Sequence, residues 1–428
     1  MKIKATLTVI AVLWVAATTG VVLVQSEEIP RVSEEGTIQV DLSEPKLGKL
    51  DRRGNHGAID AVDEPREKSE AIKIALSWLV SRQQDNGGWG PGHVAAGAKE
   101  RTTVGNTCIA LQALARDGNT PIGGTYKKEV AEAIDYVLAA IEEADAKSLF
   151  VSPIRDSQLQ RKLGTYVDTF MAASILPEFK GKMGSKKGEA KLHEGVKKLL
   201  AKIEANQAED GSWKDTGWAP TLSQGFAGKS INRAAQKGWK VDEEVRERAE
   251  EFTQGNFDRE SGTFSGEGSA GIALYSNASN LQQIQDSAFT NRQLVEELEE
   301  QVATSKDEKV RMQAEAKLQK IAKCEEDLEA ARKAVIKRLE DPNFVAGFGN
   351  NGGEEFLSYV NIGESLRDEG GEVFARWNEK MSDNMCRTQS TDGCWKGQHC
   401  ITGGTFCTST GLLVLMMDKP VDEAGSDT

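Results

Sequence analysis

A seven-residue pattern that occurs three times constrains the fold of this chain more than any other feature. The pattern Gln-x-x-(Asp/Asn)-Gly-x-Trp begins at Gln83, Gln207 and Gln389. Weaker echoes, in which an aromatic residue closely follows a glycine, occur at 262–264 and 347–348. Self-similarity of this kind predicts a repeat architecture. The fixed motif positions are Gln83, Gly87, Trp89, Gln207, Gly211, Trp213, Gln389, Gly393 and Trp395.

The same order of predicted elements surrounds each copy of the motif. An amphipathic helix comes before the motif, as the spacing of Ile72, Leu76 and Leu79 indicates. A second helix, rich in small residues, follows the motif, and the one after Thr103 is followed by Gly118, a usual helix C-terminal stop. About six such helix pairs fit into residues 69–418, so the sequence predicts an all-α fold.

These residues resemble the repeat of squalene cyclases and protein prenyltransferase β-subunits. The resemblance implies an α/α toroid, in which outer helices surround an inner ring of helices. In such a ring the motif glutamine would hydrogen-bond the end of a neighbouring outer helix. The glycine would permit a tight turn, and the tryptophan would pack between units. We therefore interpret the three motifs as structural rather than catalytic.

One segment departs from the repeat. Residues 281–340 are dense in Glu, Lys, Gln and Ala, with apolar stripes such as Leu294, Leu298 and Val302. We expect an inserted, coiled-coil-like helical hairpin that projects from the ring. Its stripe either packs on itself or binds a protein partner.

The N-terminus predicts export. Lys2 and Lys4 precede the uncharged run 5–24, which is long enough to span a bilayer. Residues 1–26 are therefore either a signal peptide or a membrane anchor, and both alternatives place the remaining chain outside the cytoplasm. The charged, proline-containing stretch 27–68 reads as a disordered linker, and 419–428 as an acidic tail. We expect a cell-envelope protein, anchored to the membrane or periplasmic or secreted.

The charge balance excludes one class of partner. The formal net charge is −13, and the basic runs are short. Nucleic-acid binding requires a basic face that this balance does not supply.

The resemblance also implies sites that this sequence supports poorly. The acidic Asp-x-Asp-Asp motif of squalene cyclases is absent, and aromatic residues make up only 6% of the chain. Prenyltransferases bind zinc through an Asp-x-Cys pair and a distant histidine. Here Asp392 and Cys394 match the pair, but His399 follows too closely. Zinc is the one cofactor that the resemblance suggests, and the spacing argues against it.

Four of the six cysteines lie between residues 386 and 407. Outside the cytoplasm such clusters more often form disulfides than metal sites. We expect a disulfide among Cys386, Cys394, Cys400 and Cys407, with a pairing that the sequence leaves open.

Carboxylates on the predicted inner helices are the remaining candidates for chemistry. Helical-barrel glycosidases and lyases place paired carboxylates at the barrel mouth. Asp168 and the pair Glu354 and Glu355 are the candidates here, although each could equally be a satisfied helix-terminal residue.

Together these observations favour binding or scaffolding over catalysis. The ligand would be an apolar molecule in the barrel or a protein partner at the hairpin. The alternative is a prenyltransferase- or squalene-cyclase-like enzyme that acts on an isoprenoid chain.

Overall fold

The computed structural model describes residues 64–349, 351–367 and 370–419. The predicted signal or anchor, nearly all of the predicted linker and most of the acidic tail lie outside these residues. The outer helices are α1 (Lys68–Val80), α3 (Lys127–Glu143), α6 (Lys186–Ala205), α8 (Glu243–Gly255), α11 (Glu308–Arg338) and α14 (Gly371–Thr388). The inner helices are α2 (Val104–Arg116), α5 (Val167–Ile175), α7 (Pro220–Gln236), α9 (Ala273–Arg292), α13 (Gly353–Arg367) and α15 (Gly404–Leu415). The remaining elements are α4 (Gln158–Lys162), the 3-10 helix η1 (Leu176–Phe179), α10 (Val295–Thr304), α12 (Pro342–Ala346), and the two-residue strands β1 (Phe257–Asp258) and β2 (Thr263–Phe264).

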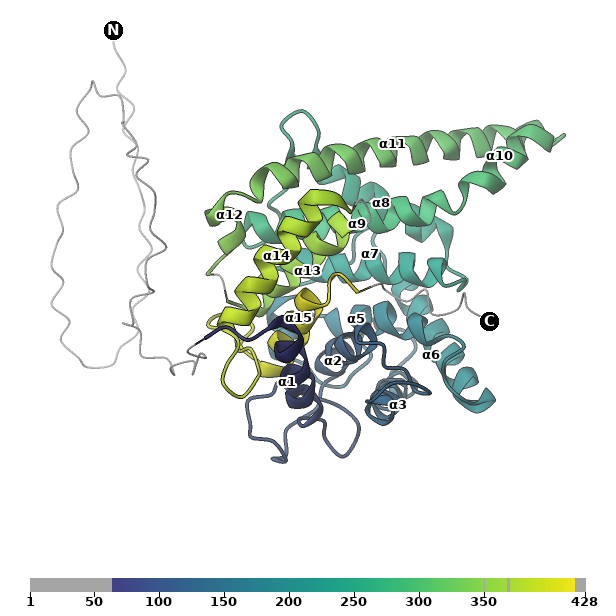
Figure 1. The fold of residues 1–428 in the computed structure, drawn as a ribbon. Coiled ribbons are helices and arrows are strands. Elements are labelled where there is room, and N and C mark those ends of the chain that lie inside the picture. The colour runs from purple at the N-terminus through teal and green to yellow at the C-terminus, as the bar shows by residue number, and fades with distance from the viewer. Residues whose placement is uncertain (1–63, 350, 368–369, 420–428) are drawn as a thin grey trace, which may run out of the picture. The chain divides into compact units, whose positions relative to one another are not determined.

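The inner helices form a closed ring. In the described residues each inner helix packs against the next in the order α2, α5, α7, α9, α13, α15, and α15 returns to α2. The six outer helices cover this ring from outside (Figure 1). The predicted all-α toroid of about six helix pairs is therefore confirmed.

Composition explains why α15 lies inside the ring and α6 lies outside it. All 12 residues of α15 are buried, and its apolar and small side chains leave no polar face. The outer helix α6 buries one stripe, which includes Lys202, and exposes most of its other lysines. A helix that is apolar on all sides must be surrounded by protein, whereas an amphipathic helix can form the surface.

The motif glutamines bind each repeat to its neighbour. Gln83 Nε2 donates to its own motif at Gly87 O and to Glu129 O in the first turn of α3, both at 2.9 Å. Gln207 makes the same pair of bonds to its motif and to the first turn of α8. Gln389 repeats the pattern with α1, at Ala71 O, so the third copy closes the ring.

The other motif positions complete the joint. The indole nitrogens of Trp89, Trp213 and Trp395 donate to carbonyls near the C-termini of α1, α6 and α14. The three motif glycines have φ between +81° and +91°, which disfavours other residues. A Cβ on Gly211 would lie 2.0 Å from Arg248 O in the neighbouring outer helix α8. Glycine is thus required by conformation and by close packing.

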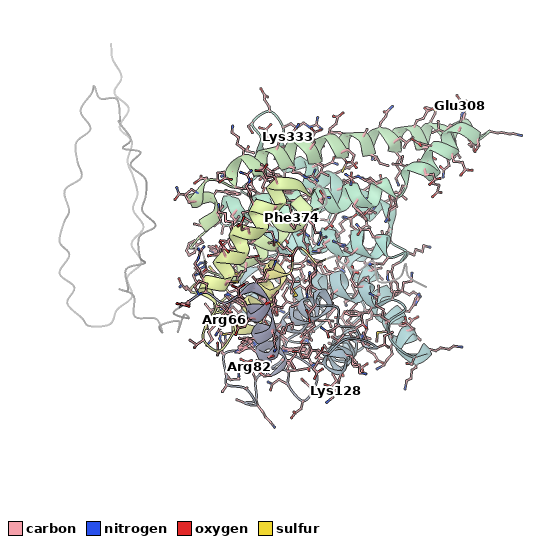
Figure 2. The ribbon with its side chains drawn as sticks, viewed as in Figure 1. Arg66, Arg82, Lys128, Glu308, Lys333 and Phe374 are labelled. Atoms are coloured by element: carbon pink, nitrogen blue, oxygen red, sulfur yellow. The ribbon has the colours of Figure 1, made fainter. Side chains whose placement is uncertain are left out.

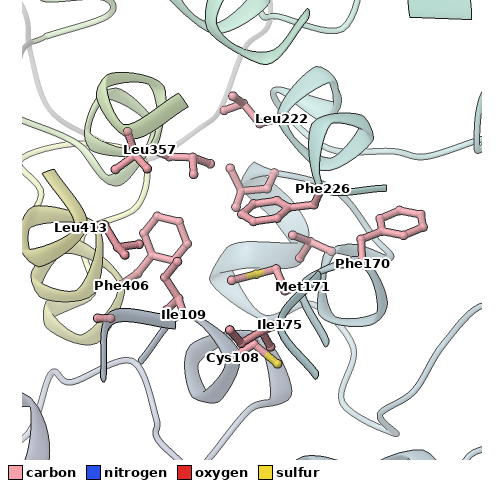
Figure 3. Packing of buried hydrophobic residues seen from close by; sticks show 14 of the residues in the cluster. Cys108, Ile109, Phe170, Met171, Ile175, Leu222, Phe226, Leu357, Phe406 and Leu413 are labelled. Atoms are coloured by element: carbon pink, nitrogen blue, oxygen red, sulfur yellow. The ribbon is translucent and has the colours of Figure 1, made fainter. Parts of the chain in front are cut away.

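Apolar side chains fill much of the lumen, the space that the inner ring encloses. Ile109, Met171, Phe226, Leu357 and Phe406 come from five different inner helices and point toward one another (Figure 3). None of these five side chains is more than 5% exposed. This part of the lumen is a packed core.

A buried charged cluster occupies the lumen nearer the C-terminal ends of the inner helices. Glu364 of α13 accepts hydrogen bonds from Arg116 of α2, from Lys229 of α7 at 2.7 Å, and from Gln282 of α9 at 2.7 Å. Burial alone would raise the pKa of the Glu364 carboxyl, but Lys229 and Arg116 outweigh it and hold the pKa well below its usual range. One carboxylate therefore ties four helices together.

The inserted hairpin is present, but it is shorter than the predicted range 281–340. Residues 281–292 belong to the buried inner helix α9, because their side chains complete the ring. The hairpin consists of α10 and the first half of α11, with a small core formed by Leu298, Ala314 and Ile321. The second half of α11 is an outer helix of the ring, as the positions of Glu308 and Lys333 show (Figure 2).

No helix among the described residues is both long and apolar enough to cross a membrane.

Candidate functional site

The candidate site lies at the N-terminal rim, the end of the barrel where the inner helices begin. First-turn residues of neighbouring inner helices contact one another there, as Gly105 of α2 and Asp168 of α5 do. The inner helices therefore run parallel, and the loops that lead into them meet on one face. Such loops commonly carry function on a rigid scaffold.

Glu355, in the first turn of α13, is held by two neighbours. Its Oε1 accepts hydrogen bonds from the hydroxyl of Tyr275 and from the backbone nitrogen of Phe348, the latter at 2.9 Å. Burial and the charge of Glu355 raise the pKa of Tyr275 well above its usual range, so this hydroxyl remains a donor. Both hydrogen bonds go to Oε1 of Glu355, so Oε2 remains for another partner.

Glu354, the preceding residue, is arranged similarly. Its Oε2 accepts a hydrogen bond from Ile401 N at 3.1 Å, and this bond fixes the loop that leads into α15. Burial, reinforced by the neighbouring charge of Glu355, raises the pKa of Glu354 to about 7. The carboxyl therefore exchanges its proton near neutral pH, as a general acid must.

His399 covers this pair. Its Nε2 lies 3.5 Å from Oε2 of Glu355, and its side chain is 17% exposed. Four buried atoms have no hydrogen-bond partner here: Glu354 Oε1, Glu355 Oε2, and both ring nitrogens of His399. Buried polar atoms without partners are uncommon and are expected at ligand or catalytic sites.

The loop that carries His399 is clamped from across the rim. Gln158 of α4 donates to Cys400 O at 3.0 Å and accepts from Thr402 N at 3.3 Å. Cys400 has φ of +51°, a strained value for a residue with a side chain. Burial and the charge of Glu354 raise the pKa of the Cys400 thiol to about 11, so it is not a thiolate nucleophile at neutral pH.

Aromatic rings form the outer wall. Phe348 is 54% exposed, and its ring lies edge-on to Trp218 at 5.4 Å and to His399 at 5.1 Å between centroids. Trp218 also meets Tyr275 at 6.1 Å, and the ammonium group of Lys162 lies 5.4 Å from the Trp218 ring. The site therefore combines carboxylates, a histidine and an aromatic platform.

Asp168 differs from the glutamate pair. Its two oxygens accept from Gly105 N and from Gln160 Nε2, both at 3.0 Å. Burial raises its pKa to about 6, although these two hydrogen bonds oppose the shift. Both oxygens are already used, so Asp168 acts as a joint between α5 and α2.

The structure does not bring the three zinc candidates together. Asp392 accepts hydrogen bonds from Cys394 N at 3.3 Å and from the indole of Trp78 at 3.2 Å, whereas His399 faces Glu355. No group of three or more His, Cys, Asp or Glu side chains in the described parts of the chain could hold a metal ion. Asp392 precedes the motif glycine, and its carboxylate stabilises the motif turn by accepting the Cys394 N–H.

The predicted disulfide is not formed. All six cysteines are free thiols, including the four in the last repeat. Cys407 donates to Ile401 O at 3.3 Å from inside α15, and burial with the charge of Asp392 raises the pKa of Cys394 to about 12. These thiols fill the joint between repeats as small apolar groups.

Tyr275 and Trp218 were missed by the sequence analysis. Tyr275 is the third residue of α9, the position that Glu355 occupies in α13. The sequence did not predict an inner helix that begins at Ala273, so Tyr275 was not recognised as a first-turn residue. Trp218 had no comparable signal, because it lies in an irregular loop after the motif.

Comparisons with known proteins support the fold. No protein-family model and no curated protein matches the chain. The GH76A alpha-1,6-mannanase from Salegentibacter sp. is similar in structure, with a TM-score of 0.50 and 10% identity, over 83% of this chain and 100% of that one. A possible GH105 member from Klebsiella pneumoniae also matches, with a TM-score of 0.41 and 13% identity, over 83% of this chain and 95% of that one. A type II terpene cyclase from Scytonema matches with a TM-score of 0.33 and 10% identity, over 83% of this chain and 98% of that one. At these identities the likeness shows the α/α-toroid fold alone.

Proposed function

We propose that this chain is an exported enzyme that cleaves glycosidic bonds by acid–base chemistry at the N-terminal rim. The observation that carries the proposal is the pair Glu354 and Glu355, each with one buried oxygen that has no hydrogen-bond partner, beside His399. A mannanase with the same fold acts on an α-1,6-mannan, which supports saccharides as the substrate class. Two carboxylates are the usual machinery for this reaction.

The two glutamates have different environments, which suits them to different roles. Glu354, with its raised pKa, would donate a proton to the leaving glycosidic oxygen as the C–O bond breaks. Oε2 of Glu355 would accept a proton from the water that attacks the sugar carbon. Tyr275 holds Glu355 in place through Oε1. The products are two hydroxyl-terminated saccharides.

Substrate access requires a change at the outer wall. Both glutamates are fully buried, and His399 lies over them with Phe348 beside it. We propose that the substrate displaces the His399 ring and stacks on Phe348 and Trp218. Aromatic faces bind the apolar face of a sugar ring well, because both surfaces are flat.

The packed lumen argues against the isoprenoid alternative. An extended apolar chain needs an open channel, but Ile109, Met171, Phe226, Leu357 and Phe406 occupy the middle of the ring. The same packing argues against an apolar ligand in this part of the barrel.

Replacing Glu355 by glutamine is expected to lower cleavage at least about 100-fold, because the base is lost while its shape is kept. Purified protein would be incubated with α-1,6-mannan, β-1,4-glucan and β-1,4-xylan, and new reducing ends would be measured. In the wild type the rate is expected to fall as pH rises through about 7, because Glu354 must be protonated to act.

Asp168→Asn is the matched control, since it alters a buried carboxylate on another inner helix. Its cleavage rate per folded molecule is expected to stay within a few-fold of the wild type. A wild-type protein that cleaves none of the three polymers, or a fully active Glu355→Gln variant, would contradict the proposal.

Scaffolding through the hairpin is a second candidate. The hairpin of α10 and α11 has its own small core and projects from the ring (Figure 1). Met312 on it is 63% exposed, so an apolar contact is available to a protein partner. A photo-crosslinking residue at position 312 is expected to give one discrete adduct in intact cells, and one at the equally exposed Ile122 is expected to give none. Identical patterns at both positions would remove this candidate.

A further inference from the structure

A second cleft opens on the loops that lead into α5 and α7. Its volume is about 740 Å³, within the range of roughly 300–1,000 Å³ that is typical of ligand pockets. It lies beside the second motif, in the loop 206–219, and beside the residue that precedes α5. Its lining includes Tyr166, Asn206, Glu209 and Lys214.

The lining combines one aromatic face with polar groups of several kinds. Tyr166 is half-buried and packs on Phe150 at 4.8 Å between centroids, which fixes its ring. The guanidinium carbon of Arg155 lies 3.5 Å from the centroid of the Phe150 ring. Around Tyr166, Lys214 provides a donor, and the side-chain oxygens of Asn206 and Glu209 provide acceptors. Such a surface suits a neutral ligand that carries many hydroxyl groups and one flat apolar face.

The loop 206–219 connects this cleft with the glutamate site. Its first half lines the cleft, and near its end Trp218 meets Phe348 and Tyr275. Thr165, which precedes Tyr166, is hydrogen-bonded to the same loop: its backbone N–H donates to Thr216 O at 3.0 Å. The cleft and the glutamate site therefore both lie on the N-terminal rim, and the loop 206–219 contributes residues to both.

We infer that the cleft is a distal binding subsite for the same saccharide, so that the substrate is a chain of several units rather than a single sugar. This inference rests on the proposed function. The cleft would hold the part of the chain away from the cleaved bond, with one sugar ring stacked on Tyr166.

Binding of oligosaccharides of defined length tests the inference. Linear α-1,6-mannose, β-1,4-glucose and β-1,4-xylose oligomers of two to six units would be titrated calorimetrically into protein that carries Glu355→Gln, so that no chain is cut. For at least one series, affinity is expected to rise with length. Adding Tyr166→Ala is expected to weaken binding of the hexamer roughly fivefold to tenfold and to leave the dimer unchanged.

Two further variants separate a subsite from a folding defect. Tyr166→Phe keeps the stacking face and is expected to bind the hexamer almost as the parent does. Tyr126→Ala removes another half-buried tyrosine, which precedes the outer helix α3, and is expected to leave the length dependence unchanged.

The outcomes distinguish the cleft from the glutamate site. Binding that strengthens with length and depends on Tyr166, in a protein that cleaves nothing, would support the cleft and refute the proposed cleavage. Affinity that does not depend on length in any series, or that Tyr166→Ala leaves unchanged for every length, would overturn the subsite.

Discussion

Replacing Glu364 by alanine is expected to destabilise the protein by about 3–5 kcal/mol, the usual cost of removing one partner from a buried ion pair. The variant would leave Arg116 and Lys229 buried in the lumen without their counter-charge. It would also remove a carboxylate that binds side chains of α2, α7 and α9 to α13. Denaturant unfolding followed by circular dichroism would measure the loss.

The pH dependence of this loss is a sharper check. The folded-state pKa of Glu364 is depressed, so its contribution to stability is present above the unfolded-state pKa of about 4.3 and disappears as pH falls through the lower folded-state value. The difference between wild type and variant is therefore expected in full at pH 7 and to shrink below about pH 4.3. Glu315→Ala, on the exposed face of α11, is expected to change stability by less than about 0.5 kcal/mol. Equal losses in both variants would show that the lumen cluster does not hold the ring.

Replacing Trp395 by alanine is expected to cost about 3–5 kcal/mol and to loosen the joint between the last repeat and the first. Its indole is 1% exposed, donates to Met385 O at 3.0 Å and packs against Gly411 of α15. The adjacent motif residues hold α1, through Gln389 to Ala71 and through Arg66 to Gln389. Hydrogen exchange is therefore expected to accelerate in α1 and α15.

Trp213→Ala is the matched comparison, because Trp213 makes the same indole bond in the second motif and is equally buried. Its repeat lies in the middle of the chain, so covalent connections hold the neighbouring units on both sides. The global loss is expected to be similar, but faster exchange is expected in α6, α7 and α8 rather than in α1. The same exchange pattern in both variants would contradict a special role for the last motif in ring closure.

The sequence alone determined the architecture, because the ring is built from joints that the motif itself encodes. Gln83, Gln207 and Gln389 make equivalent hydrogen bonds, and each motif glycine meets a neighbouring outer helix at the same place. A local pattern that repeats its contacts predicts the fold well. The hairpin was predicted to be too long, because the amide- and serine-rich inner helix α9 resembles the solvent-exposed helices in composition.

Only the tertiary structure decided which polar residues have a chemical role. Asp168 and Glu355 look alike in the sequence, as carboxylates in the first turn of an inner helix. The ring gives both oxygens of Asp168 a partner, but it places His399 against a free oxygen of Glu355. That difference arises partly from residues that are distant in the sequence, such as Gly105 for Asp168 and Tyr275 for Glu355. It depends on how the ring closes, and no spacing along the chain records it.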